Sequence, residues 1–319
     1  MLKRCASLIL IAFLVTGCLH HGRKSSIPPA EASGSRTQQF RPVSTFNQVD
    51  AEGRINLNLH TGYKKPQVVL MGDARDLAQV KVQVNQGTLH ISLGSGYPRY
   101  GDVSADIQGR FLNKLRYIGA GVIKGNQLNT SYLSIYLENQ GTTQLGGYIG
   151  LRQLVVNGGG LTQISGISSP YLEINFKGNP KVQLVGVANI SKLDLEGTGW
   201  LSLYWVKSDN LRIKAKKGAK IQLAGSVNRL EVELWGMSRF KGRYLRAQRS
   251  FVKTHGRSVA EISSVNHQST LASDASDIFY YNLSKTRVDF MAYNGAVLDM
   301  RDWEAPELKD FTQYNKQFP

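Results

Sequence analysis

The sequence predicts an all-β fold, a single right-handed parallel β-helix of about nine or ten rungs that follows an N-terminal region of strands. A block of strand, glycine-rich turn and strand recurs along residues 111–300. Apolar and polar residues alternate within each block, which is the two-residue period of a β-strand. Glycine contributes 32 of 319 residues and proline only 9. That composition suits many short strands joined by tight turns.

The first 39 residues predict an export signal and a tether. Lys3 and Arg4 precede an apolar run of about ten residues, which is too short to span a membrane and typical of a signal peptide. The sequence Val-Thr-Gly-Cys ending at Cys18 resembles the lipobox of bacterial lipoproteins. We therefore expect a signal peptide over 1–17, lipidation of Cys18, a flexible tether over 18–39 and anchorage at the outer membrane. An ordinary signal peptide with a chance cysteine is the alternative.

Residues 40–110 are expected to form the N-terminal strands. Gly87 is placed to turn a hairpin between the last two of them. The segments with alternating apolar residues are 46–59, 67–71, 80–84 and 88–93.

Residues 111–300 are expected to form the repeating rungs. Similar strand sequences begin at positions 133, 154, 172, 193, 211 and 230, so the period is close to nineteen residues. Each rung buries alternate residues and is stable only when neighbours stack on it at about 4.8 Å. Glycines between the two strands of a block mark the corners, because a sharp turn with positive φ suits glycine best. Parallel crossovers are right-handed in nearly all proteins, which gives the expected hand.

The alignment of blocks places outward-facing glutamines in one column. Stacked amides can hydrogen-bond along such a column, so we interpret it as a structural ladder, although a binding role is the alternative. The members are Gln144, Gln163, Gln183 and Gln222, interrupted by Ser202.

The N-terminal strands and the rungs together resemble the head GIN domain family of putative autotransporter adhesins. The resemblance is carried by the opening FNQVDAEGRINLNLHTG, by VVLMGDARDLAQVKVQVNQGTLHISL and by rungs of the LxVxGxG type downstream. It implies a β-solenoid of envelope or secreted proteins and supplies no catalytic residue. We therefore expect a head GIN β-helix domain over 40–300, followed by a C-terminal cap or tail over 301–319.

Acidic residues of the rungs give the main alternative, a polysaccharide-active lyase or glycosidase that would use Asp194, Glu196, Glu231 or Glu233. The expected outward columns read Glu173, Asp194, Arg212, Glu231 in one case and Asn175, Glu196, Lys214, Glu233, Lys253 in the other. Alternating signs at the rung spacing favour a ladder of ion pairs over an active site. The histidines are scattered and no phosphate-binding motif occurs. We therefore predict no enzyme activity, no metal and no cofactor.

Positive charge is concentrated in a few rungs. The chain has 39 Lys and Arg against 23 Asp and Glu, a net charge of +16, and 14 of the basic residues lie between positions 207 and 257 with only three acidic ones. Aromatic residues are interleaved with them, which predicts a binding patch for polyanions. The members of this expected patch are Trp205, Arg212, Lys214, Lys216, Lys217, Lys220, Trp235, Arg239, Lys241, Arg243, Arg246 and Arg249.

These features predict a non-enzymatic, lipid-anchored protein of the cell envelope whose β-helix is a surface for adhesion or scaffolding. The expected partners are the membrane, through the N-terminal lipid, and an anionic polysaccharide, lipopolysaccharide or acidic envelope protein, through the basic patch. An exported location argues against nucleic acid as the partner of the basic residues.

Overall fold

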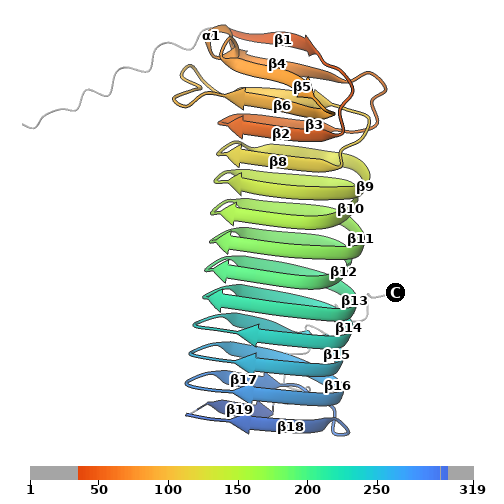
Figure 1. The fold of residues 1–319 in the computed structure, drawn as a ribbon, viewed down its shortest axis with the longest axis vertical. Coiled ribbons are helices and arrows are strands. Elements are labelled where there is room, and N and C mark those ends of the chain that lie inside the picture. Colours follow the sequence, from red (N-terminus) through yellow and green to blue (C-terminus); the bar gives the residue numbers. More distant parts are fainter. Residues whose placement is uncertain (1–34, 295, 301–319) are drawn as a thin grey trace, which may run out of the picture. The chain divides into compact units, whose positions relative to one another are not determined.

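The computed structural model describes residues 35–294 and 296–300, which form a β-solenoid of about nine turns with a strand region at its N-terminal end (Figure 1). The predicted all-β class is confirmed, and all rungs from β9 onward pair in parallel. The expected signal peptide, the lipidation site Cys18 and the C-terminal cap or tail over 301–319 lie outside the described residues. Within the described part of the chain, no helix is long and apolar enough to cross a bilayer.

The strands of the N-terminal region are β1 (Arg36–Pro42), β2 (Gln48–Gly53), β3 (Ile55–His60), β4 (Gln67–Asp73), β5 (Val80–Asn85), β6 (Thr88–Leu93), β7 (Val103–Gln108) and β8 (Lys114–Gly119), with a single short helix α1 (Ala74–Leu77). The strands of the repeating body are β9 (Ile123–Asn139), β10 (Thr142–Gly158), β11 (Leu161–Gly178), β12 (Lys181–Gly197), β13 (Trp200–Lys217), β14 (Lys220–Leu234), β15 (Arg239–Thr254), β16 (Val259–Ala272), β17 (Asp277–Tyr280), β18 (Arg287–Ala292) and β19 (Val297–Met300).

Each long strand from β9 to β16 runs along two faces of the solenoid. Its first half continues the face that contains β3, β17 and β19, here called the first face. Its second half continues the face that contains β2, β8 and β18, called the second face, which is in front in Figure 1. The two halves meet at the bend, and the glycine-rich turn that leads to the next strand is the corner. In Figure 1 the corners lie on the left and the bends on the right.

In alternate rungs, the observed strand register differs by two residues from the expected register. Ile135, Leu154, Ile174, Leu193 and Ile213 are partners in successive strands, so the period alternates between 19 and 20 residues. Some of the starting positions expected from the sequence belong to this column. The others belong to the buried position two residues earlier in the rung. Both positions carry large apolar residues, and a shift of two preserves the inward and outward pattern. Apolar alternation alone therefore does not distinguish the two alignments.

The interior of the solenoid is apolar along most of its length, and the last rungs also bury polar side chains such as Gln268. The apolar residues that alternate along β9, β11 and β13 are buried, and Phe176 and Phe240 are among the largest side chains inside. One cluster of contacting buried residues extends from Phe46 to Ile278. The N-terminal strands therefore share their core with the repeating rungs.

The corners require a left-handed backbone, as the sequence predicts for most of them. Gly178 and Gly197 have φ of +89° and +129°, and Gly236 and Gly256 have +72° and +76°. The next rung after Gly197 differs, because Lys217 and not Gly218 takes the left-handed position, with φ of +72°. A second column of glycines with positive φ lies at the bend and was not predicted. Its members are Gly147, Gly166, Gly186 and Gly225.

Tyr117 joins three backbone segments at a corner of the N-terminal rungs. The side chain is fully buried, and its hydroxyl lies 2.9 Å from the carbonyl oxygen of Gly53 and 3.0 Å from that of Ile55. The hydroxyl also accepts a hydrogen bond from the N–H of Gly121 at 2.7 Å. Burial raises the pKa of Tyr117, so the phenol stays protonated and can donate.

The N-terminal strands complete the solenoid in an order that differs from the chain order. Strand β2 lies between β6 and β8, and β3 lies between β7 and β9. At the end of the stack, β4 pairs antiparallel with β7 and β1, and the predicted hairpin at Gly87 pairs β5 antiparallel with β6. Strand β1 begins at Arg36, inside the segment expected to be a tether. These antiparallel strands cover the parallel edges of the first rungs.

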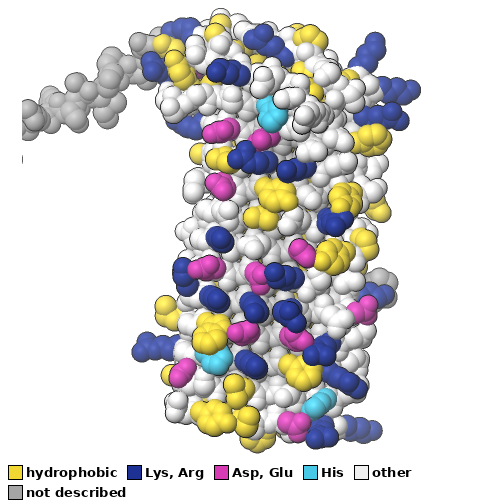
Figure 2. Space-filling model, viewed as in Figure 1, with side chains coloured by type: hydrophobic (Ala, Val, Ile, Leu, Met, Phe, Trp, Pro, Cys, Tyr) yellow, Lys and Arg dark blue, Asp and Glu magenta, His cyan; other side chains and the backbone are white. Residues whose placement is uncertain are grey.

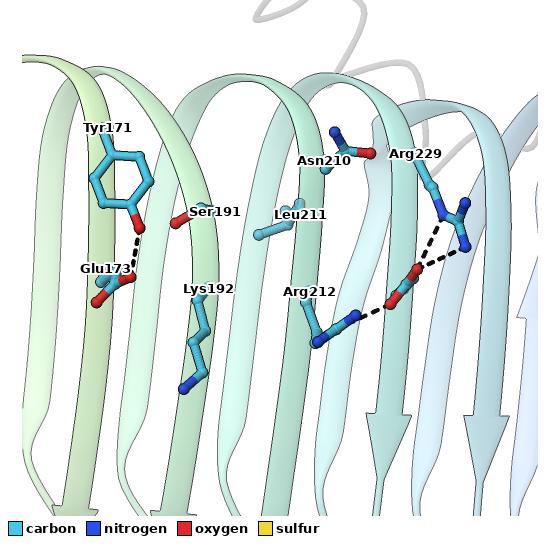
Figure 3. Close-up of a pocket in the computed structure, with 9 residues that line it drawn as sticks. Tyr171, Glu173, Ser191, Lys192, Asn210, Leu211, Arg212 and Arg229 are labelled. Atoms are coloured by element: carbon cyan, nitrogen blue, oxygen red, sulfur yellow. Dashed lines mark hydrogen bonds and ion pairs between the residues drawn. The ribbon is translucent and has the colours of Figure 1, made fainter.

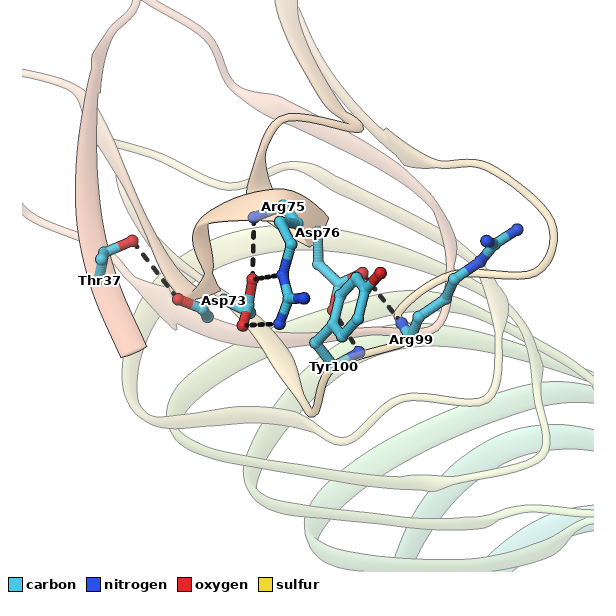
Figure 4. A network of polar contacts seen from close by, with 7 residues as sticks. Thr37, Asp73, Arg75, Asp76, Arg99 and Tyr100 are labelled. Carbon is cyan, nitrogen blue, oxygen red and sulfur yellow. Dashed lines mark hydrogen bonds and ion pairs between the residues drawn. The ribbon is translucent and has the colours of Figure 1, made fainter. Parts of the chain in front are cut away.

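Helix α1 fixes the loop that leads into β7. The carboxylate of Asp76 is fully buried and accepts the N–H groups of Arg99 and Tyr100 at 2.9 and 2.8 Å (Figure 4). Asp73 caps the helix and binds the Arg75 guanidinium through both oxygens, and that guanidinium covers the Tyr100 ring. These contacts give both buried carboxylates hydrogen-bond donors, which offsets the cost of burying them.

Candidate binding site

Charged side chains on the second face form the ladder that the sequence predicts, in a corrected register. The observed columns are Glu173, Lys192, Arg212, Glu231 and Asn175, Asp194, Lys214, Glu233, Lys253. Asp194 and Glu196 thus lie two residues further along the rung than expected, for the reason given for the core column. Figure 2 shows acidic and basic side chains interspersed over this face.

Each of the four candidate catalytic carboxylates has a cationic partner. Asp194 lies 2.8 Å from the Lys192 ammonium, and Glu196 lies 2.9 Å from that of Lys217. Glu231 pairs with Arg212 at 3.0 Å, and Glu233 lies 3.5 Å from the ammonium of Lys214. Pairs exposed to this degree contribute little to stability individually. Their main effect is to neutralise the second face.

The same contacts set the protonation of these carboxylates. A hydrogen bond from Lys217 lowers the pKa of Glu196, and one from Arg212 lowers that of Glu231. The Trp235 indole N–H donates to Glu233 and lowers its pKa as well. A glycosidase needs one carboxylic acid whose pKa is raised towards neutrality. These three carboxylates are shifted in the opposite direction, so their environment does not suit a general acid.

No group of three or more His, Cys, Asp or Glu side chains in the described part of the chain is arranged to hold a metal ion.

The glutamine column on the first face is confirmed as a ladder for three of its four predicted glutamines. Gln144 donates to Gln163 at 3.2 Å, and Gln163 donates to Gln183 at 3.0 Å. Ser202 follows in the same column and is buried.

The residues of the expected basic patch lie on several sides of the solenoid, because each rung travels once around it. Arg212, Lys214 and Lys216 lie on the second face, and Lys241 and Arg243 on the first. Lys217, Lys220, Trp235 and Arg239 lie at or beside the corners, whereas Trp205, Arg246 and Arg249 lie at the bend. The structure therefore does not bring the twelve together. Of the twelve, Arg249 belongs to the surface described next, and Arg212 lines a hollow in that surface.

A row of exposed and half-buried side chains, here called the edge ridge, follows the border between the bend and the second face. Figure 2 shows hydrophobic and basic side chains along this right-hand border of the view. In rung order the edge ridge consists of Tyr132, Arg152, Tyr171, Ser191, Asn210, Arg229, Arg249, His267 and Arg287.

The C-terminal half of the edge ridge is basic. Arg229, Arg249, His267 and Arg287 are direct partners in successive strands. Arg229 binds Glu231 and covers the Phe251 ring, and Asp289 lies 2.7 Å from His267 and 3.5 Å from Arg287. Arg249 is exposed and has no ion-pair partner among the described residues. Three arginines and a histidine thus follow one another at the rung spacing of about 4.8 Å.

A hollow of about 540 Å³ interrupts the middle of the edge ridge (Figure 3). It arises because Ser191 and Asn210 are smaller than Tyr171 and Arg229, which stand on either side of them. Glu173, Lys192, Arg212 and Glu231 of the second face also line it. The hollow is of a size that suits small ligands.

Most of the edge ridge was missed from the sequence, although a signal for part of it exists. Asn210, Arg229, Arg249, His267 and Arg287 recur at intervals of 18 to 20 residues, and each of the first four comes just before a buried residue of the second face. The earlier members are displaced by irregular register near the bend. Counting by a fixed period fails at those bulges.

Comparison with known proteins identifies the family. The family model described as "Putative auto-transporter adhesin, head GIN domain" matches residues 45–191 and again residues 151–283. The chain belongs to the head GIN domain family. The two overlapping matches of this head GIN protein cover most of its solenoid, and the predicted resemblance is confirmed. No curated protein sequence matches it.

Several solved structures resemble the head GIN protein at low sequence identity. A putative adhesin from Parabacteroides merdae is 14% identical with a TM-score of 0.48, and the match covers 85% of this chain and 98% of that one. A putative lipid binding protein from Parabacteroides distasonis is 12% identical with a TM-score of 0.47 and the same coverages. A putative adhesin from Parabacteroides distasonis is 15% identical with a TM-score of 0.44, covering 84% and 98%.

Proposed function

We propose that this head GIN protein is a non-enzymatic, lipid-anchored protein of the cell envelope that uses the edge ridge to bind anionic glycans in adhesion. The observation that carries the proposal is the run of three arginines and a histidine at successive rungs of the edge ridge. Membership of a family described as adhesins agrees with a role at the cell surface. A lipopolysaccharide or an acidic envelope protein also carries negative charge that these cations would attract.

The geometry of the edge ridge favours a linear polyanion. Side chains on a solenoid are held at a fixed spacing by the stacked strands, so the cations form a straight row along the axis. A polymer with regularly spaced negative charges can contact several of them at once, and such contacts add through effective concentration. Ion pairs partly neutralise the second face beside the row. Within the row, Arg229, His267 and Arg287 also have acidic neighbours, so Arg249 is the cation most available to an anion.

The lipid anchor rests on the lipobox-like sequence that ends at Cys18. Two or more acyl chains suffice for stable attachment to a bilayer. We expect the Cys18→Ser variant to leave the membrane fraction of the producing bacterium, whereas wild type stays in it after a high-salt wash. Equal membrane retention of both proteins would contradict lipidation at this cysteine.

Glycan binding is tested with the full-length protein and two soluble polymers, polygalacturonate and neutral dextran. We expect polygalacturonate to bind at low salt and to lose at least about tenfold in affinity when NaCl rises from about 50 mM to about 500 mM, because salt screens exposed charges. Dextran should not bind. Absent or salt-insensitive polygalacturonate binding would contradict the proposal. Accumulation of shortened polymer chains would instead support a polysaccharide-active enzyme.

A further inference from the structure

The hollow in the edge ridge has a length that suits two linked sugar units. Tyr171 stands on β11 and Arg229 on β14, so the two flanking side chains are three rungs, about 14 Å, apart along the axis. Ser191 and Asn210 occupy the rungs between them, and Leu211 lies beneath. The Asn210 amide has no hydrogen-bond partner among the described residues and is exposed. It can serve as donor and acceptor for a hydroxyl group.

One wall of the hollow is aromatic. The Tyr171 side chain is 47% exposed, and its hydroxyl donates to Glu173 at 2.5 Å, which holds the ring in place. In Figure 3 the face of the Tyr171 ring is turned towards the viewer. The face of an aromatic ring carries partial negative charge and attracts the slightly positive C–H groups of an apolar surface. A pyranose ring presents such a surface on its C–H face.

The opposite wall is cationic, and its arginine side chains are held in place by a glutamate. Arg212 and Arg229 donate hydrogen bonds to Glu231 from two sides, at 3.0 and 2.9 Å. A guanidinium has five N–H donors, so both arginines keep donors for a ligand. Planar guanidinium groups suit a carboxylate in particular, because two parallel hydrogen bonds can form.

The lining of the hollow has little net charge. Three cations, Lys192, Arg212 and Arg229, line it with two carboxylates, Glu173 and Glu231, and the charge of Lys192 is already balanced by Asp194 at 2.8 Å. A singly charged carboxylate suits such a site better than a phosphate monoester, which carries nearly two negative charges at neutral pH.

We infer that the hollow between Tyr171 and Arg229 is the subsite for two linked uronic acid units of the glycan, with the ring of one unit on Tyr171 and the carboxylate of the next on Arg212 and Arg229. This inference rests on the proposed glycan binding and specifies the kind of unit recognised. The polymer on either side of these units extends along the edge ridge. Towards the C-terminal rungs it meets Arg249, and towards the N-terminal rungs it meets Arg152 and Tyr132.

The test compares Tyr171→Ala with the wild-type full-length protein on two polyanions. Polygalacturonate carries carboxylates on pyranose rings, whereas inorganic polyphosphate has no ring to stack. We expect Tyr171→Ala to weaken polygalacturonate binding by about fivefold to tenfold and polyphosphate binding by less than about twofold. Both affinities are measured by calorimetry at low salt.

Two further variants serve as controls. Tyr171→Phe keeps the ring and loses only the hydroxyl that binds Glu173, so it should retain affinity for polygalacturonate within about twofold. Tyr148→Ala removes a tyrosine of similar exposure, 57%, that lies outside the edge ridge, and should change neither affinity. Circular dichroism confirms that each variant is folded.

The outcomes separate this inference from the proposed function. Unchanged polygalacturonate binding by Tyr171→Ala would overturn the subsite, while salt-sensitive binding by wild type would leave the proposed function standing. An equal loss for both polyanions would overturn the assignment to a uronic acid. Binding of neither polyanion by wild type would overturn both the proposed function and the subsite.

Discussion

Replacing Gly197 by alanine is expected to lower the free energy of unfolding by about 3–5 kcal/mol. Gly197 has φ of +129°, a conformation that side chains with a Cβ rarely adopt, and an added Cβ would overlap the carbonyl oxygen of Gly178 in the preceding rung. Relief would require the strands to move apart, but the rungs are held by the ladder between β12 and β11. The measurement is the midpoint of urea unfolding followed by circular dichroism.

The neighbouring rung supplies a matched control. Lys217 is the direct partner of Gly197 and has φ of +72°, so this corner accepts a side chain at a strained position. Lys217→Gly relieves the strain, but it loses the ion pair with Glu196 and makes the unfolded chain more flexible. We expect these effects to cancel to within about 1 kcal/mol. A Gly197→Ala variant as stable as wild type, or an equal loss for Lys217→Gly, would show that the corner does not limit stability.

The sequence predicts the architecture well because solenoid rungs repeat the same physical requirement. Alternating apolar residues identify the buried side of each strand, and glycines such as Gly178 and Gly197 mark corners that need a left-handed backbone. The exact register is less accessible. Leu133 and Ile135 are both buried, so an alignment shifted by two residues buries the same kind of side chain.

The spatial order of the N-terminal strands also could not be predicted from the sequence. Strands β2 and β3 precede β6 and β7 in the chain but lie between those strands and the next rung. Nothing in a pattern of alternating residues specifies which strand is the neighbour of another. The observed order follows from the shared core, in which Phe46 belongs to the same cluster as the rungs.

The binding surface shows why charge counted along the chain differs from charge on a surface. The basic segment 207–257 covers several rungs, and each rung passes both faces, the bend and the corner. Arg239 and Arg249 are ten residues apart in β15, yet one lies at the corner and the other on the edge ridge. A surface column is composed of residues one full period apart, as Arg229 and Arg249 are.

Reversal of the charge of Arg249 is expected to have the largest effect on ligand binding. Arg249 stands between Arg229 and His267 in the edge ridge and has no ion-pair partner among the described residues, so its charge is available to an anion. Arg249→Glu places a carboxylate in the middle of the row and repels the polymer there. We expect at least about a tenfold loss of affinity for polygalacturonate at low salt. Folding should be unaffected, because Arg249 is exposed.

The most direct test of the edge ridge compares Arg249→Glu with Arg239→Glu. Both arginines are exposed residues of β15, and the two variants have the same net charge. If the edge ridge binds the glycan, polygalacturonate affinity at low salt falls at least about tenfold in Arg249→Glu and less than about twofold in Arg239→Glu. Equal losses in the two variants would mean that only overall charge attracts the polymer, and would contradict a binding site on the edge ridge.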